Sequence, residues 1–123
     1  MFKPFDLTGR VALITGGNGG IGLGMAVGLA QAGAEVAIWG TNAEKNEAAL
    51  TELTKTGVNA SAWICDVSDE AQVDRQFAAT LAQHGRIDGC FANAGIGGRG
   101  TAFDDMTREE WDRIIAVNQS GVF

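Results

Sequence analysis

The sequence has no tyrosine, one histidine and only two cysteines among its 123 residues. Two cysteines are too few for a disulfide scaffold, and neither has the spacing of a metal ligand, so we expect no metal site. No run approaches the roughly 18 apolar residues that span a bilayer. Nine Lys and Arg against 15 Asp and Glu give a formal net charge of −6, so no basic stripe is available for nucleic-acid phosphates.

A hydrophobic fraction of 46% with 20% charged residues is typical of an ordinary globular chain. No repeat, low-complexity tract or Pro/Ser linker divides it, so we expect one domain over 1–123. The segment Met1–Asp6 has no long apolar stretch behind Lys3, so we expect no secretion signal and a cytoplasmic location. Glycine is abundant, at 18 residues, which indicates tight turns where backbone approaches something closely.

Short apolar runs alternate with longer amphipathic segments, the pattern of an α/β sheet. The predicted strands are 11–15, 35–39, 61–65 and 87–92, and the predicted helices are about 20–32, 42–56, 68–84 and one from 107. The expected N-caps are Asn42, Ser68 and Thr107, and the expected C-terminal glycines are Gly33, Gly57 and Gly85.

The predicted core includes three aromatic residues and both thiols: Phe77, Phe91, Trp111, Cys65 and Cys90. His84 falls in the last turn of its helix, where the helix dipole favours it. Since helices that follow parallel strands run back along the sheet, His84 is expected at the end away from any ligand, in a structural role.

Four strands joined by helical crossovers predict a parallel sheet in the order 3-2-1-4. Ligands of such sheets bind at the carboxyl ends of the strands where the order reverses, here between the first and fourth strands. Two turns fall at that point, one after Thr15 and one at Asn93–Gly95. The topology therefore predicts a single ligand site there.

The first of these turns is rich in glycine. Gly17, Gly19 and Gly22 fit G-x-G-x-x-G, while Gly16, Gly20 and Gly22 fit G-x-x-x-G-x-G. A diphosphate needs backbone N–H groups free of side chains, and a helix N-terminus adds partial positive charge. No Lys-Ser/Thr pair follows the glycines, which excludes a P-loop. The turn between a buried strand and a helix therefore predicts a dinucleotide site of Rossmann type.

Read as Thr-Gly-x-x-x-Gly-x-Gly, the turn from Thr15 to Gly22 resembles the short-chain dehydrogenase/reductase family. Four further stretches agree in order and spacing, so that the resemblance covers the chain almost end to end: Asp66-Val67, Gly85–Asp88, Asn93-Ala94-Gly95 and Val117–Phe123.

The resemblance implies a role for each matching residue. Asp66 would accept a hydrogen bond from the adenine amino group, Val67 would pack on the ring, and Asn118 would be a catalytic residue whose backbone binds a water in a proton relay. The other implied cofactor-binding residues are Gly16, Asn18, Gly19, Gly20, Ile21 and Gly22 of the turn, Thr41 after the second strand, and Asn93, Ala94 and Gly95. Asn18 and Ile21 would lie on the diphosphate and nicotinamide side.

The implied reaction is hydride transfer between a nicotinamide and a secondary alcohol or ketone, such as a sugar, sugar acid, steroid or 3-oxoacyl thioester. Its tyrosine, lysine and serine have no match here, and a Tyr-x-x-x-Lys motif would follow Phe123. The resemblance thus implies a parent about twice as long that supplies further strands, of which 1–123 is the N-terminal half. It also implies a homo-oligomer, associated through the helix that begins near Thr107.

The choice between NAD and NADP depends on the end of the second strand. NAD sites usually place an acid there, roughly 20 residues past the glycines. The stretch Trp39-Gly40-Thr41-Asn42 has none, yet neither Thr41 nor Gly19 offers a cation for a 2′-phosphate. We therefore expect NAD rather than NADP.

Two other functions fit parts of the pattern. A non-catalytic dinucleotide sensor would share the fold and lack the downstream tyrosine and lysine. An S-adenosylmethionine methyltransferase shares a glycine-rich first turn, but not the pattern of Asn93–Gly95 and Asn118.

Overall fold

The structure, a computed structural model, describes residues 3–123; Met1 and Phe2, the start of the segment examined for a secretion signal, lie outside the described residues. Strands β1 (Val11–Thr15), β2 (Glu35–Gly40), β3 (Ala60–Ile64) and β4 (Gly89–Phe91) alternate with helices α1 (Gly20–Gln31), α2 (Ala43–Thr54), α3 (Glu70–His84) and α4 (Arg108–Ile115). Short helical turns are η1 (Lys3–Phe5), η2 (Phe103–Asp105) and the π-helical η3 (Ala116–Ser120). None of the helices described in residues 3–123 is long and apolar enough to cross a membrane.

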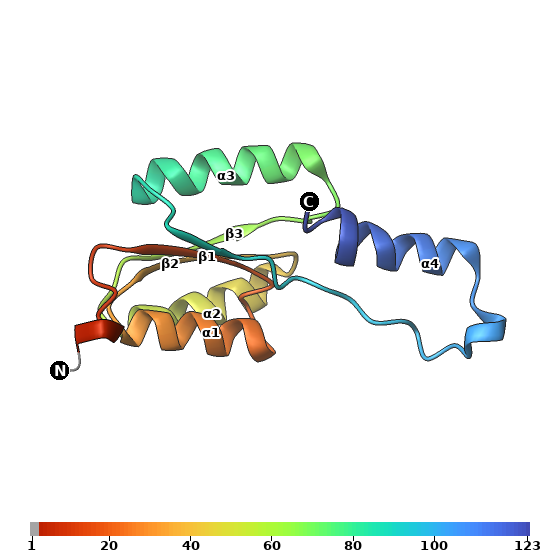
Figure 1. Ribbon diagram of the computed structural model, residues 1–123, viewed down its shortest axis with the longest axis horizontal. Coiled ribbons are helices and arrows are strands. Elements are labelled where there is room, and N and C mark those ends of the chain that lie inside the picture. Colours follow the sequence, from red (N-terminus) through yellow and green to blue (C-terminus); the bar gives the residue numbers. More distant parts are fainter. Residues whose placement is uncertain (1–2) are drawn as a thin grey trace.

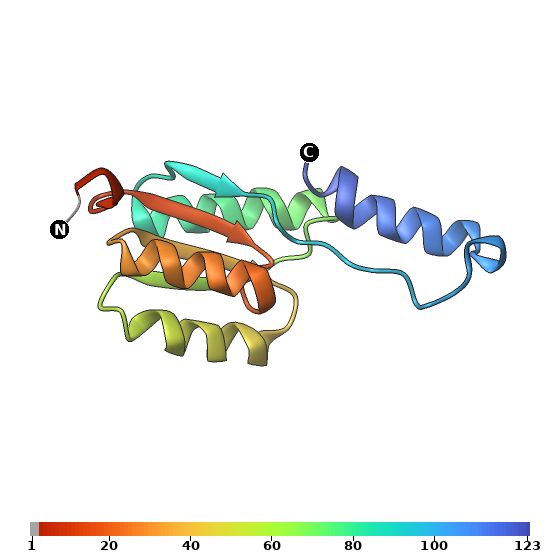
Figure 2. The same cartoon turned by 60° about the horizontal axis from the view of Figure 1, so that its bottom comes forward.

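The four strands form one parallel sheet in the order β3-β2-β1-β4, which confirms the predicted topology. Helices α1 and α2 cover one face and α3 covers the other, as Figures 1 and 2 show. The strand order runs outward from β1 to β3 and then continues with β4 on the other side of β1. Because the strands are parallel, the turns that follow β1 and β4 lie at the same end of the sheet.

The two central strands are buried on both faces. Ile14 and Ile38 pack under α1 and α2, while Leu13 and Trp39 pack on the α3 side. Each large aliphatic side chain buried in this way contributes about 1.5–3 kcal/mol. The indole Nε1 of Trp39 donates to the hydroxyl of Thr80 at 3.1 Å, so the polar atom of this buried ring is satisfied.

Most helix ends follow their sequence signals. The side chains of Asn42 and Thr107 accept hydrogen bonds from the N–H groups of Lys45 and Glu110, which confirms both N-caps. The glycines after α1, α2 and α3 all have positive φ, as C-terminal glycines do: Gly33, Gly57 and Gly85.

The predicted cap at Ser68 is wrong. Asp69 caps α3 and accepts from the N–H of Gln72, because the helix begins only at Glu70. Ser68 belongs instead to a turn in which its N–H and hydroxyl both donate to Asp66 Oδ1, at 2.9 and 2.6 Å.

The fourth strand is shorter than 87–92. Within residues 3–123, only Gly89–Phe91 pair with β1, opposite Ala12–Ile14. The third strand ends at Ile64, one residue before its predicted end, so Cys65 follows the strand.

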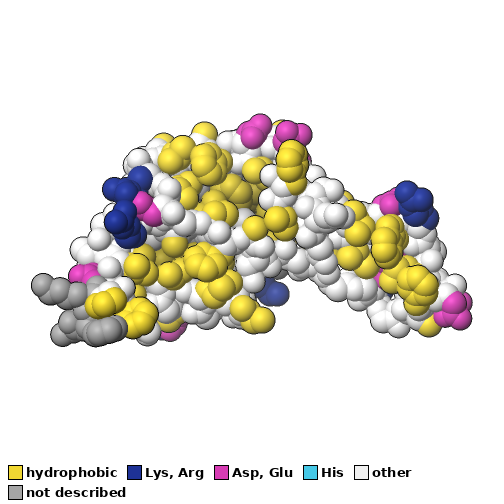
Figure 3. All heavy atoms as spheres, viewed as in Figure 1, with side chains coloured by type: hydrophobic (Ala, Val, Ile, Leu, Met, Phe, Trp, Pro, Cys, Tyr) yellow, Lys and Arg dark blue, Asp and Glu magenta, His cyan; other side chains and the backbone are white. Residues whose placement is uncertain are grey.

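The predicted burial of several apolar residues is also wrong. Phe77, Phe91 and Trp111 are exposed, and of the two free thiols Cys65 is buried while Cys90 is exposed. Phe77 and Phe91 lie near the open edge of the sheet, where no strand pairs with β4 on its outer side within residues 3–123. Trp111 lies on α4, which extends beyond the end of the sheet (Figure 1). Figure 3 shows hydrophobic side chains gathered over the middle of the side seen in Figure 1, between α3 and α1.

His84 is structural, as predicted, at the end of the sheet opposite the ligand turns. Its ring has no exposed surface and lies 2.7 Å from both Glu35 Oε2 and Ser61 Oγ. Ser61 Oγ also accepts from the indole of Trp63 at 3.2 Å. These bonds join α3 to β2 and β3.

At the end of the sheet away from the ligand turns, the carboxylate of Asp88 joins the start of β1 to the start of β4. Asp88 accepts from the N–H of Val11 at 2.8 Å and from the Nε of Arg86 at 2.9 Å, and pairs with Arg10 at 3.3 Å. The hydrogen bond from Arg86, followed by that from Val11, lowers the pKa of Asp88 to about 2. The folded state therefore favours the charged form of this side chain.

Replacing Asp88 should destabilise the fold in a pH-dependent way. A carboxyl whose pKa is lowered by folding adds stability above its unfolded pKa of about 4, and that stability is lost as the pH falls through about 2. We expect Asp88→Asn to lower Tm by several degrees at pH 7. The difference in Tm from the unmodified protein should shrink between pH 4 and pH 2. Thermal unfolding at a series of pH values measures this. Asp112→Asn, which removes an exposed i,i+4 pair with Arg108, is the control and should change Tm little. A deficit for Asp88→Asn that is independent of pH would contradict the assignment.

Candidate functional site

The turns that follow β1 and β4 are tied together by side-chain hydrogen bonds. The hydroxyl of Thr15 accepts from the N–H of Ala94 at 3.0 Å and lies 3.4 Å from the carbonyl of Phe91. The carboxamide of Asn93 donates to the carbonyls of Thr15 and Gly16, at 3.1 and 3.4 Å. We call this cluster the Thr15–Asn93 clasp; it holds the two loops side by side where the strand order reverses.

Two glycines of the first turn are required by this close approach. Gly16 has φ +67, and a Cβ there would lie 2.9 Å from Ala94 Cα. A Cβ on Gly22 would lie 2.6 Å from Asn93 Nδ2 and closer still to the carbonyl of Gly16. The backbone at Gly19 and Gly20 instead faces open space, with nothing within 4 Å of a Cβ.

Helix α1 starts at this turn without a side-chain cap. Gly19 is its N-cap residue and has an extended backbone, and no acidic side chain lies in the first turn. The first N–H groups of a helix have no partner within the helix and carry partial positive charge. The turn therefore presents uncapped donors beside the β1–β4 reversal, a surface that suits an anion such as a diphosphate.

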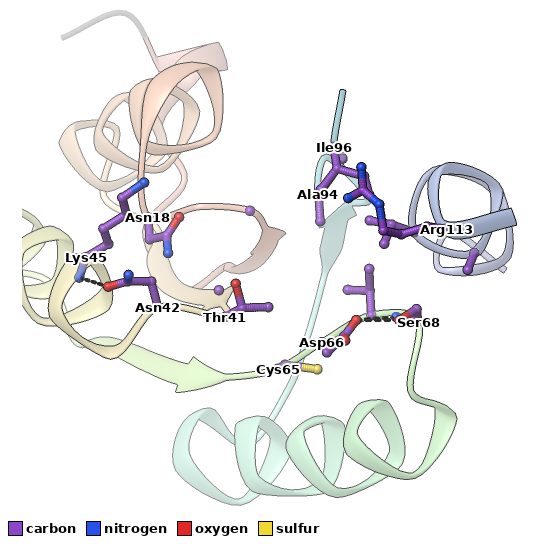
Figure 4. A pocket seen from close by; sticks show the side chains of 16 residues that line it. Asn18, Thr41, Asn42, Lys45, Cys65, Asp66, Ser68, Ala94, Ile96 and Arg113 are labelled. Atoms are coloured by element: carbon purple, nitrogen blue, oxygen red, sulfur yellow. Dashed lines mark hydrogen bonds between the residues drawn. The ribbon is translucent and has the colours of Figure 1, made fainter. Parts of the chain in front are cut away.

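A pocket of about 450 Å³ opens at this edge of the sheet (Figure 4). Its lining includes seven of the predicted site residues: Gly16, Asn18, Thr41, Asp66, Val67, Ala94 and Gly95. Gly19, Gly20, Ile21 and Gly22 lie in the adjoining turn and do not line this pocket; Ile21 is 80% exposed. Asn93 and Asn118 are also absent from the lining and act on the loops behind it.

Asp66 occupies the wall formed by the loop after β3. Its Oδ1 is taken by the N–H and hydroxyl of Ser68, and its own N–H donates to Gln72 Oε1 at 2.9 Å. One carboxylate oxygen is thus engaged in the turn, which fixes the direction of the group. Val67 lies beside it, and a Cβ on Gly121 would come within 2.7 Å of its Cγ2, so η3 and this loop are in close contact.

Asn118 binds the loop after β4 with both ends of its carboxamide. Its Oδ1 accepts from the N–H of Ile96 at 2.8 Å, and its Nδ2 donates to the carbonyl of the same residue at 2.9 Å. It lies in the π-helical turn η3, a distortion that frequently marks functional sites. Each end of the carboxamide makes one hydrogen bond to Ile96, so this side chain holds the loop after β4 in place.

A buried glutamate fixes the rest of that loop. Glu110 on α4 is 6% exposed, and its Oε1 accepts from the N–H of Arg99 at 2.6 Å. That backbone hydrogen bond lowers the pKa of Glu110, with smaller contributions from Thr101 and from the charges of Arg99 and Arg113. The loop is therefore held from α4 and from η3.

Sequence reasoning missed several residues of the pocket. Arg113, on α4, directs its guanidinium toward Ala94 and Ile96 (Figure 4), and its Nε is buried without a hydrogen-bond partner among the described residues. Lys45 lines the pocket from the first turn of α2. No motif marks either residue, because each reaches the pocket from a different helix.

Asn46 was also missed, although the sequence carries a signal for it. It shares one face of α2 with Ala49 and Leu53, and all three are buried. An amide on the apolar face of a helix needs buried partners, which Asn46 finds at the ends of β2 and β3.

The thiol of Cys65 lines the pocket but is poorly suited to chemistry. Burial, followed by the charges of Asp66 and Asp69, raises its pKa to about 11. A thiol of this kind is protonated at neutral pH and is a weak nucleophile. Across residues 3–123, no group of three or more His, Cys, Asp and Glu is placed to hold a metal ion.

Residues 10–123 match the short chain dehydrogenase family. The chain belongs to this family. A relative among curated proteins, levodione reductase from Leifsonia aquatica, is 42% identical over 118 residues, which are 94% of this chain and 44% of that protein. The chain thus spans about half the length of the curated relatives it matches.

Solved structures of short-chain dehydrogenases have the same fold. An NAD+-bound xylitol dehydrogenase superposes with a TM-score of 0.92 at 33% identity, over 95% of this chain and 45% of that one. A metagenomic short-chain oxidoreductase in complex with NADP has a TM-score of 0.87 at 36% identity, over 94% and 52% of the two chains. These similarities confirm the Rossmann-type sheet predicted from the sequence.

Two glycines of α1 give a matched test of the Thr15–Asn93 clasp. We expect Gly22→Ala to lower the free energy of unfolding by about 1–3 kcal/mol, since its methyl group would collide with the Gly16 carbonyl and with Asn93. Gly24→Ala adds the same methyl group where nothing lies within 4 Å, and should raise it by about 1 kcal/mol. Urea unfolding of both variants measures the difference. Equal stability of the two would show that the approach of α1 to the clasp is looser than described.

Proposed function

We propose that this protein binds a nicotinamide dinucleotide across the carboxyl ends of β1 and β4 and interconverts a secondary alcohol and a ketone by hydride transfer. The observation that carries the proposal is the pocket at the strand-order reversal, lined by Gly16, Asp66 and Gly95 and adjoined by the uncapped start of α1. The glycine turn suits a diphosphate. There is no room for side chains at Gly16 and Gly22 beside the clasp, and nothing obstructs the approach of a ligand to the backbone at Gly19 and Gly20. Relatives named as a reductase and as an NAD+-bound dehydrogenase support it.

The residues of the chain take distinct roles in this proposal. The oxygen of Asp66 that Ser68 does not engage accepts from the adenine amino group, and Val67 packs on the ring. The first N–H groups of α1 bind the diphosphate. Asn118, whose carboxamide is committed to Ile96, holds the loop after β4 and offers its main chain to a water of the proton path. The bound nicotinamide supplies or accepts the hydride.

We further propose that residues 1–123 form the dinucleotide-binding half of a single-domain enzyme about twice as long. The share of each relative that the chain covers, 44% of levodione reductase and 45% of xylitol dehydrogenase, supports this. The tyrosine, lysine and serine of the reaction would then lie beyond Phe123. A cytoplasmic location and a homo-oligomer stay predictions.

We propose NAD as the preferred cofactor. Thr41 and Gly19, the positions nearest to the predicted ribose end, carry no cation that could bind a 2′-phosphate. Lys45 lines the same pocket from the first turn of α2 and is exposed, and its charge reduces the preference. The preference for NAD should therefore be moderate.

We expect the protein to bind NAD about tenfold more tightly than NADP. Thr41→Arg should narrow or reverse this difference, because it places a guanidinium at the end of β2 that can bind a 2′-phosphate. Calorimetric titration of both cofactors at one salt concentration measures it. Thr51→Arg adds the same charge on an exposed face of α2 that does not line the pocket and should leave the ratio unchanged. Tighter binding of NADP by the unmodified protein would overturn the proposed preference.

The proposed reaction is tested with the full-length protein by following NADH absorbance with a panel of ketones and secondary alcohols. We expect turnover, and we expect Asn118→Ala to lower kcat by about 100-fold or more. Without the two bonds to Ile96 the main chain at position 118 no longer holds the water in place, and a general acid–base step contributes about that factor. The affinity of this variant for NAD should fall less than kcat, because Asn118 reaches the pocket only through Ile96. Tight NAD binding without turnover across the panel would favour the dinucleotide sensor instead.

A further inference from the structure

A buried amide joins α2 to the carboxyl ends of β2 and β3. Asn46 is 4% exposed, and its Nδ2 donates to the carbonyl of Gly40 at 3.0 Å and to that of Trp63 at 3.3 Å. Carbonyl oxygens can only accept, so the NH₂ group must face them. The orientation of this carboxamide is therefore fixed, and its Oδ1 is an acceptor directed toward the glycine turn.

The orientation of the Asn46 carboxamide also fixes the orientation of the Asn18 carboxamide. Because Oδ1 of Asn46 can only accept, Asn18 must present its own NH₂ group to it, and the two atoms lie 2.9 Å apart. The Oδ1 of Asn18 is thus turned away from α2, and within residues 3–123 it accepts no hydrogen bond. Figure 4 shows the carboxamide of Asn18 directed into the pocket beside Lys45 and Thr41.

The same pair of amides fills the space at the end of β2. A Cβ on Gly40 would lie 2.6 Å from Asn46 Oδ1 and closer still to Asn18 Nδ2. Dinucleotide sites commonly place an acidic side chain at this strand end to bind the ribose hydroxyls. Here that space belongs to the amide pair, and an acid at position 40 would displace it.

The contact with Asn46 at the end of β2 places Asn18 away from the diphosphate and nicotinamide side that the resemblance implies. We propose that Asn18 Oδ1 accepts a hydrogen bond from the 2′-hydroxyl of the adenosine ribose, and that Asn46 is the positioning residue that turns this oxygen toward the pocket. The inference rests on the proposed dinucleotide function and names the contact that would distinguish the two cofactors. A neutral amide oxygen binds a hydroxyl donor, whereas a 2′-phosphate presents acceptor oxygens to it. The contact therefore replaces the carboxylate that position 40 cannot hold.

The test measures binding rather than turnover. The full-length protein is titrated with NAD and with the NAD analogue whose adenosine ribose lacks the 2′-hydroxyl, and Kd is taken from calorimetry. We expect the analogue to bind the unmodified full-length protein about fivefold more weakly than NAD does, which is the effect of one neutral hydrogen bond. In Asn18→Ala, NAD should bind as weakly as the analogue, so the ratio falls to about one.

Asn46→Ala should give the same ratio of about one, although Asn46 does not line the pocket. The control is Leu53→Ala, which removes a fully buried side chain from the same face of α2 and should lower Tm while keeping the fivefold ratio. Destabilisation alone therefore cannot produce the expected result. If Asn46→Ala does not fold, Asn18→Ala decides, because it leaves both hydrogen bonds donated by Asn46 in place.

Three results would overturn the inference alone, and a fourth would overturn the proposed function with it. Equal affinity of the parent protein for NAD and the analogue would show that the 2′-hydroxyl makes no such contact. An unchanged fivefold ratio in Asn18→Ala would assign the contact to another residue, and an unchanged ratio in Asn46→Ala would remove its positioning role. A parent protein that binds neither NAD nor NADP would overturn the proposed function together with the inference.

Discussion

Beyond their last paired residues, β1 and β4 have no ladder to hold them together, and the loops that follow could separate. The hydroxyl of Thr15 and the carboxamide of Asn93 prevent this by satisfying backbone groups of both loops at once. Because the two loops are held together, α1 must start directly above the carbonyl of Gly16, which is why position 22 has no room for a side chain. The position of the pocket depends on this contact, because Gly16 and Ala94 both line it.

Burial on both faces made the central strands predictable. Val11–Thr15 is a continuous apolar run, and the structure buries every one of its residues. The bounds of β4 are less well determined by its own residues, because the stretch that pairs with β1 is shorter than the run 87–92. Residues of the outer surface could not be assigned for a similar reason. Phe77 and Phe91 have the spacing of core residues, but their exposure depends on what lies beside β4, which composition and periodicity do not contain.

The candidate site divides along the same line. Glycine spacing and the residues after each strand predicted the parts that come from one local segment, such as the turn at Gly16 and the loop at Asp66. Competition between neighbouring side chains was harder to foresee. Ser68 and Asp69 can both cap a helix, and the structure gives the cap to Asp69 because Ser68 is bound to Asp66. Arg113 and Asn46 reach the site across the fold, so their contribution depends on packing between elements.

The pocket wall at the end of β2 shows how a main-chain arrangement can set chemical character without a charged group. The carbonyls of Gly40 and Trp63 lie on neighbouring strands, and their spacing is a consequence of parallel pairing. Asn46 donates to both carbonyls, which leaves its Oδ1 as an acceptor. Asn18 donates to that Oδ1 and leaves its own Oδ1 as an acceptor, so the direction of each hydrogen bond determines the next. A carboxylate would present an acceptor with a charge that the surroundings must solvate, whereas this chain presents one through neutral groups whose buried members are satisfied. On the proposed function, specificity at this end would be a property of the sheet and of α2 together, and not of one residue at the end of β2.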